Sequence, residues 1–82
     1  MFNTCMSEKI KQDISIGKNL KALRIKSNLT QDQVAAKLQI MGLPASREII
    51  SQMELGKYSI RVSILLELKK LYHANFDDFF KI

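Results

Sequence analysis

The strongest constraint on the fold of this chain is the stretch 30–56, in which two short helical patterns are separated by glycine and proline. Thr30 followed by Gln33 has the spacing of a capping box, so we expect a helix from this threonine to about residue 41. The serine at the start of 46–55 is a suitable N-cap for a second helix. The stretch therefore predicts two short helices joined by a turn.

The second of these helices has two chemically different sides. At 100° per residue, apolar side chains gather on one side and hydrogen-bonding side chains on the other. The first side holds Ile49, Ile50, Met53 and Glu54, and the second holds Arg47, Glu48, Ser51 and Gln52. Such a helix is expected to be anchored to a domain by its apolar side and to present its polar side to a partner.

A set of landmarks in fixed order extends this pattern over most of the chain. They are Ile16–Gly17, Leu20, Leu23–Arg24, Leu29–Thr30–Gln31, Val34–Ala35, Leu38, Ile50, Met53–Glu54, Gly56–Lys57 and Phe76–Phe80. With these residues the chain resembles the phage-repressor/Cro-like (xenobiotic-response-element type) helix-turn-helix DNA-binding domain. The resemblance implies an all-α, compact five-helix bundle of the lambda-repressor-like DNA-binding type. The chain departs from the family pattern at 39–45, where the connection is longer than usual.

We divide the chain into an N-terminal extension (1–15), partly flexible or helical, and a helix-turn-helix domain (16–82). Residues 1–6 have no periodicity, and 7–14 could extend the first helix or form a separate turn. The extension holds two lysines, one aspartate and one glutamate, so the whole net charge of +5 lies in the domain. A basic domain favours a polyanionic partner.

The remaining helices follow from spacing and end signals. We expect helices at about 16–26, 61–72 and 75–80. Asn28 and His73 are placed to take the left-handed conformation that ends a helix. Asn75 is the expected cap of the last helix. Its phenylalanines Phe76, Phe79 and Phe80 are expected to pack on the core, with one left exposed for a dimer contact as an alternative.

The long connection contains three apolar residues, Ile40, Met41 and Leu43. We expect them to extend the preceding helix by a turn and to tuck under the following one. The alternative is that Met41 and Leu43 form an exposed patch for a partner.

Arg24 and Glu54 are interpreted as a structural pair. As a surface cation, Arg24 would suit the C-terminal end of its helix. The resemblance instead pairs it with Glu54, which lies at the core-facing edge of its helix and needs a cation or donors there.

The polar side of helix 46–55 is the candidate DNA-reading surface. Arg47 can donate two hydrogen bonds to guanine, Gln52 can pair with adenine, and Glu48 can accept from cytosine. The resemblance places these three residues at positions that usually face bases. The alternative for this side is an ordinary solvated helix surface.

Other residues are expected at the DNA backbone, because phosphate contacts fix the register of a protein without reading sequence. The resemblance implies this role for Gln31, Ser46, Ser51, Lys57, Tyr58, Ser59 and Arg61. For each residue taken singly, a solvated polar surface is the alternative.

The sequence thus favours a sequence-specific, double-stranded DNA-binding transcription regulator that binds its operator as a homodimer. The alternative is a protein-interaction module on the same fold, such as an antitoxin-like or anti-repressor partner binder. We expect no enzyme, no cofactor and no metal site, because the single histidine and single cysteine form no catalytic or ligand cluster. With no membrane span or signal peptide, we expect a cytoplasmic protein that is nucleoid-associated on DNA. We also expect no effector domain after residue 82.

Overall fold

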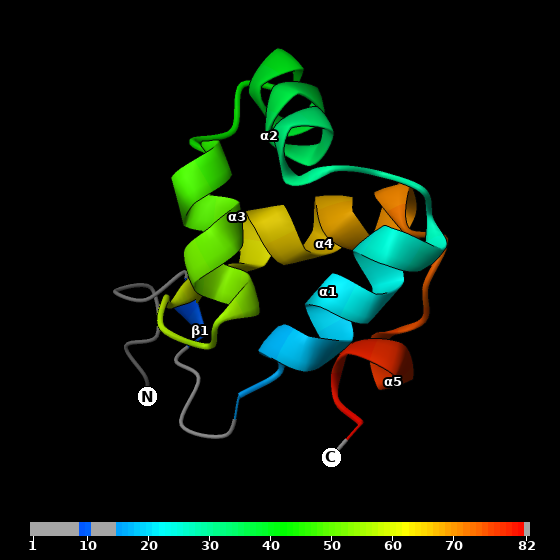
Figure 1. Cartoon of the computed structure of the whole chain (residues 1–82). Helices are drawn as coiled ribbons and strands as arrows, with labels where there is room; N and C mark the ends of the chain where they lie inside the picture. Colours follow the sequence, from blue (N-terminus) through cyan, green and yellow to red (C-terminus); the bar gives the residue numbers. More distant parts are fainter. Residues whose placement is uncertain (1–8, 11–14, 82) are drawn as a thin grey trace.

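The computed structural model describes residues 9–10 and 15–81. This part of the chain forms five helices and one very short two-stranded ladder (Figure 1). The helices are α1 (Gly17–Lys26), α2 (Gln31–Ile40), α3 (Arg47–Glu54), α4 (Val62–Leu71) and α5 (Phe76–Phe79), and the strands are β1 (Lys9–Ile10) and β2 (Ile60–Arg61). The expected five-helix, lambda-repressor-like fold is confirmed.

The helices surround one apolar core, and α3 packs against both α1 and α2 (Figure 1). Burying a large apolar side chain contributes about 2 kcal/mol, so the core is the main source of stability. Its members are Ile16, Leu20, Val34, Ala35, Leu38, Ala45, Ile50, Met53, Ile60, Ile64, Leu65, Leu68, Tyr72, Ala74 and Phe79. Burial also raises the pKa of the Tyr72 hydroxyl well above its usual range.

The helix ends follow the expected end signals. At the start of α2 the Gln33 backbone N–H donates to Thr30 Oγ1 (3.1 Å), and the Thr30 N–H donates to Gln33 Oε1 (2.9 Å). Asn28 and His73 both have positive φ, 58° and 50°, directly after α1 and α4. At α5 the Asn75 N–H donates to Asp78 Oδ2 (2.9 Å). This hydrogen bond is the main reason why the pKa of the Asp78 carboxyl is lowered.

The expectation for the α2–α3 connection is wrong for two of its three apolar residues. Helix α2 ends at Ile40, whose side chain is 85% exposed, and Met41 is 54% exposed. Gly42 then reverses the chain with a φ of 79°. Ile40 lies roughly 200° around the helix from the buried Leu38, and Met41 is the C-cap residue that follows the last turn of α2. Leu43 does pack against the core, so the alternative of an exposed patch applies to Met41 alone.

The N-terminal segment also differs from expectation where it is described. Lys9 and Ile10 pair with Arg61 and Ile60 in antiparallel register, so they form a strand rather than a helix or turn. The backbone of β2 offers a free edge, and pairing with it satisfies hydrogen-bonding groups on both segments. The expectations for residues 1–8 and 11–14 lie outside the described residues, and the division at residue 15 stays a prediction.

Only one of the three C-terminal phenylalanines belongs to the core. Phe79 is fully buried, whereas Phe76 and Phe80 are 46% and 44% exposed. The Lys69 ammonium lies 5.2 Å from the centre of the Phe76 ring, within the range of a cation–π contact. The packing expectation is therefore right for Phe79 and only partly right for its two neighbours.

Candidate nucleic-acid interface

Helix α3 is seated by its apolar side and exposes its polar side. Ile50 and Met53 are each 1% exposed, in the core. Arg47, Glu48 and Gln52 are exposed on the same eight-residue helix. The two-sided character expected from spacing is therefore present in the structure, and the three candidate base-reading side chains reach solvent.

The N-terminal end of α3 begins at the expected cap. The Ile49 backbone N–H donates to Ser46 Oγ (3.2 Å), so this hydroxyl satisfies one of the free amides at the start of the helix. Losing such a cap costs about 1 kcal/mol. Ser46 thus has a local structural role in the free protein beside its expected backbone contact with DNA.

The structure brings the expected structural pair together at the C-terminal end of α3. Arg24 Nε lies 2.7 Å from Glu54 Oε2, and its Nη2 donates to Glu54 Oε1 (3.2 Å). The third guanidinium nitrogen donates to the Leu29 carbonyl (2.9 Å). Hydrogen bonding to the Glu54 carboxylate raises the pKa of Arg24. The bidentate pair thus joins α1, α3 and the loop before α2.

Gln31 takes part in the same cluster. Its side-chain amide donates to Glu54 Oε1 (3.0 Å), so the first turn of α2 is tied to the last turn of α3. The Gln31 side chain also lines a shallow hollow on the exposed side of α3. One amide can therefore brace α3 and still lie beside the expected DNA surface.

Gly17 allows α1 to cross α3 at very short range. A Cβ atom at this position would lie 2.2 Å from the Glu54 carbonyl oxygen, closer than atoms can approach. A glycine is therefore needed here for packing rather than for backbone freedom. Together with the Arg24–Glu54 pair, this contact fixes where α3 ends relative to α1.

Two adjacent hollows lie between the exposed side of α3 and the neighbouring helices α2 and α1. One is lined by Gln31, Arg47, Glu48, Ser51 and Gln52, which are all expected DNA-contacting residues. The other adds Lys18 and Lys21 of α1, next to Ser51 and Leu55. These two lysines are not among the site residues expected from the sequence. Their i, i+3 spacing off the buried stripe of α1 was the available signal.

Among the described residues, the ion-pair partner of Arg47 is a weak one. Its Nε lies 3.9 Å from Asp32 Oδ1, and the two side chains are 64% and 75% exposed. An ion pair this long and this exposed contributes little to stability. The guanidinium is therefore free to exchange Asp32 for another acceptor at small cost.

The loop after α3 begins with a glycine turn. Gly56 has a φ of 77°, and the Lys57 backbone N–H donates to the Gln52 carbonyl (3.0 Å). Lys57 is exposed, while Ser59 and Arg61 are partly buried. Tyr58 packs partly against the core. This loop thus carries one exposed cation and three partly buried polar residues directly after α3.

Two other kinds of site are absent from residues 9–10 and 15–81. No group of three or more His, Cys, Asp or Glu side chains in this part of the chain could hold a metal ion. No helix in it has the length and apolarity needed to cross a membrane.

Comparison with known proteins identifies the family. The family model described as helix-turn-helix, of the Cro/C1 type, matches residues 20–79, which includes α2, α3 and the whole hydrogen-bonded cluster around Glu54. Neither curated proteins nor solved structures gave a match. Because the family model covers well over half of the chain, this protein belongs to the Cro/C1-type helix-turn-helix family of DNA-binding domains.

Proposed function

We propose that this protein is a sequence-specific transcription regulator that reads double-stranded DNA with α3 in the major groove. The observation that carries the proposal is the seating of α3, with Ile50 and Met53 buried and Arg47 and Gln52 exposed on one short helix. The major groove admits an α-helix and displays a distinct donor and acceptor pattern for each base pair. Membership of a DNA-binding family supports the same reading.

Within this proposal, the side chains divide into two groups by their chemistry. Arg47 would donate to guanine O6 and N7, Gln52 would pair with adenine N6 and N7, and Glu48 would accept from cytosine N4. The second group would hold phosphates, and its members are Gln31, Ser46, Ser51, Lys57, Tyr58, Ser59 and Arg61. To this group we add Lys18 and Lys21, which line a hollow beside α3.

We further propose that two copies bind one operator. A single short helix reads only a few base pairs, and paired half-sites about 34 Å apart would place two α3 helices in successive major grooves. The half-exposed Phe76 and Phe80 give the C-terminal end an apolar surface that a second copy could cover.

The proposal is tested by selecting binding sites from random-sequence duplex DNA and measuring affinity at several salt concentrations. We expect one motif with twofold symmetry to be enriched, and we expect affinity to fall steeply with salt because phosphate contacts release counterions. Weak binding to every duplex with no enriched motif would contradict sequence-specific recognition. A single asymmetric half-site would contradict the homodimer alone.

A second candidate function is an antitoxin-like or anti-repressor module that buries the polar side of α3 against a partner protein. The exposed Ile40 and Met41 beside the α2–α3 turn favour it, because they are apolar and uncovered in the single chain. Purification of a stoichiometric complex in which Arg47 and Gln52 are protected from solvent would support this function. Free access of DNA to α3 in that complex would contradict it.

A further inference from the structure

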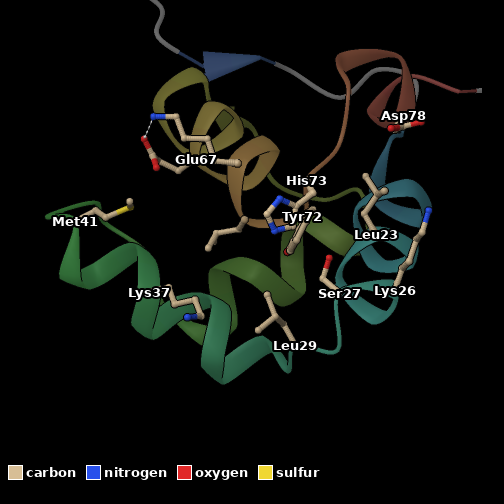
Figure 2. A pocket seen from close by; sticks show the side chains of 12 residues that line it. Leu23, Lys26, Ser27, Leu29, Lys37, Met41, Glu67, Tyr72, His73 and Asp78 are labelled. Carbon is tan, nitrogen blue, oxygen red and sulfur yellow. Dashed lines mark hydrogen bonds and ion pairs between the residues drawn. The ribbon is translucent and has the colours of Figure 1, made fainter.

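A second hollowed surface lies away from the proposed DNA interface. It is a groove between the C-terminal end of α1, the C-terminal half of α2 and the end of α4 (Figure 2). Leu23, Leu29 and Leu71 contribute apolar side chains to it, and Tyr72 lies buried at its base. Met41 and Leu23 stand at opposite ends in Figure 2. Helix α3 contributes no residue to this lining, so the groove is a separate surface.

The rim of the groove carries three lysines against two carboxylates, Glu67 and Asp78, so it is basic by one charge. Lys26, Lys37 and Lys70 reach it from three different helices, and all three are exposed. Lys70 has a carboxylate partner, since its Nζ lies 3.5 Å from Glu67 Oε2. Within residues 15–81, Lys26 and Lys37 form no ion pair. Lys26 lies near enough to the Asp78 carboxylate to help lower its pKa, so Lys37 is the rim lysine most readily available to a carboxylate of a partner.

The end of α2 adds an exposed apolar side chain to this basic rim. Met41 is 54% exposed and lines the groove. Leaving it in water is unfavourable, because burying an apolar side chain such as methionine stabilises the protein. Methionine is flexible and polarisable and therefore common on surfaces that bind other proteins. Exposed apolar groups rimmed by charge are typical of an interaction site.

The shape and chemistry of the groove determine what could fill it. An open groove edged by exposed lysines is unsuited to a compact small molecule, which needs enclosure and several fixed polar groups. Duplex DNA would meet the lysines with phosphate but would leave the leucine side chains uncovered. An amphipathic peptide segment can do both, because apolar side chains on one face and carboxylates at its edges match the floor and the rim.

We propose that this groove is a docking site for an acidic amphipathic segment of a partner protein. Leucine or phenylalanine side chains of that segment would lie against Leu23, Leu29 and Met41, and its Asp or Glu carboxylates would pair with Lys26 and Lys37. The groove and α3 lie on different surfaces, so DNA and this partner can bind at the same time. The inference does not depend on what α3 reads.

The probe is a synthetic twelve-residue peptide with leucine at helical spacing and Asp or Glu at the other positions. It is titrated into the full ¹⁵N-labelled chain, and amide chemical shifts are followed. We expect saturable shifts at the amides of Leu29, Lys37, Met41 and Leu71. Two control peptides, one with serine for each leucine and one with lysine for each acidic residue, should leave these amides unchanged. Equal binding of either control would overturn the proposal.

Matched variants separate this groove from the DNA surface. Lys37→Glu should weaken peptide binding about tenfold, since it turns an attraction into a repulsion, while Lys57→Glu should leave it unchanged. If Lys57→Glu removes binding and Lys37→Glu does not, the peptide is acting as a DNA mimic on α3 and the proposal is wrong. Both lysines are exposed, so both variants should fold, and their thermal unfolding curves check this.

A neighbouring pair of residues tests the apolar part of the site. Met41→Asp should weaken peptide binding, whereas Ile40→Asp should not, because Ile40 is more exposed and does not line the groove. An equal effect of the two variants would contradict docking in this groove. Sodium dodecanoate is the last probe. Saturable shifts at Leu29 and Met41 with dodecanoate but not with the acidic peptide would contradict docking of a partner protein and would indicate that the groove binds an anionic amphiphile.

Discussion

The two ends of α3 are held by different kinds of structure. Its C-terminal end is fixed by the Arg24–Glu54 pair, by Gln31 and by the close crossing of α1 at Gly17. Its N-terminal end is reached through a turn in which Ile40 and Met41 are exposed and only Leu43 and Ala45 pack on the core. There the Ser46 cap and one hydrogen bond from Gln39 Nε2 to the Ala45 carbonyl (2.6 Å) hold the chain.

This difference explains how a long connection is compatible with a helix-turn-helix domain. The orientation of α3 is determined by its buried residues and by the cluster at Glu54, which lie at one side and one end of the helix. The added residues at the other end extend outward, as the 85% exposure of Ile40 shows. Changes in sequence at this turn should therefore be tolerated, and changes at the crossing with α1 should not.

The largest effect is expected from removing the carboxylate of the cluster. Glu54→Ala leaves the Arg24 guanidinium, whose side chain is only 12% exposed, without its charged partner. We expect a loss of about 3 kcal/mol in the free energy of unfolding, measured by urea denaturation. Glu48→Ala on the exposed side of the same helix is the control and should cost no more than about 0.5 kcal/mol. Equal losses would show that the C-terminal end of α3 is not specially held.

A slightly smaller effect is expected at the crossing of α1 and α3. In Gly17→Ala the new methyl group would meet the Glu54 carbonyl oxygen at 2.2 Å, so the helices must move apart. We expect a loss of about 2 kcal/mol, measured in the same denaturation experiment. An unchanged midpoint would mean that α1 does not approach the end of α3 this closely.

The matched change at the other end of α3 should cost less. A Cβ atom at Gly42 would have no heavy atom within 4 Å, and only its φ of 79° disfavours an alanine. The left-handed conformation of a non-glycine residue costs about 1 kcal/mol, so Gly42→Ala should destabilise the chain by about half as much as Gly17→Ala. The comparison between the two ends fails if Gly42→Ala is the more damaging variant.

Local signals predicted most of this molecule correctly. The capping box at Thr30, the left-handed residues Asn28 and His73 and the buried stripe of α3 all depend on residues close together in sequence. Ile40 and Met41 were misjudged because periodicity identifies the apolar side of a helix but not how far its neighbours extend along it. Strand β1 has two residues, too few to show an alternating pattern.

The site shows the same limit. The position of Glu54 on its helix was enough to place it at the core-facing edge. The close approach of Gly17 to the Glu54 carbonyl, in contrast, depends on how two helices cross, and no local pattern describes that crossing. Lys18 and Lys21 were missed for a similar reason. Their place beside Ser51 depends on the angle between α1 and α3, and the sequence of either helix alone does not contain that angle.

The most direct test of the central claim compares Arg47→Ala with Lys57→Ala on the selected DNA site and on each of its single-base substitutions. We predict that Arg47→Ala loses about 1–3 kcal/mol of binding free energy and stops discriminating at one base position. Lys57→Ala should instead weaken all sequences equally and reduce the salt slope by about one. If Arg47→Ala weakens every sequence by the same factor and keeps the full base preference, α3 does not read DNA through this side chain, and the account is contradicted.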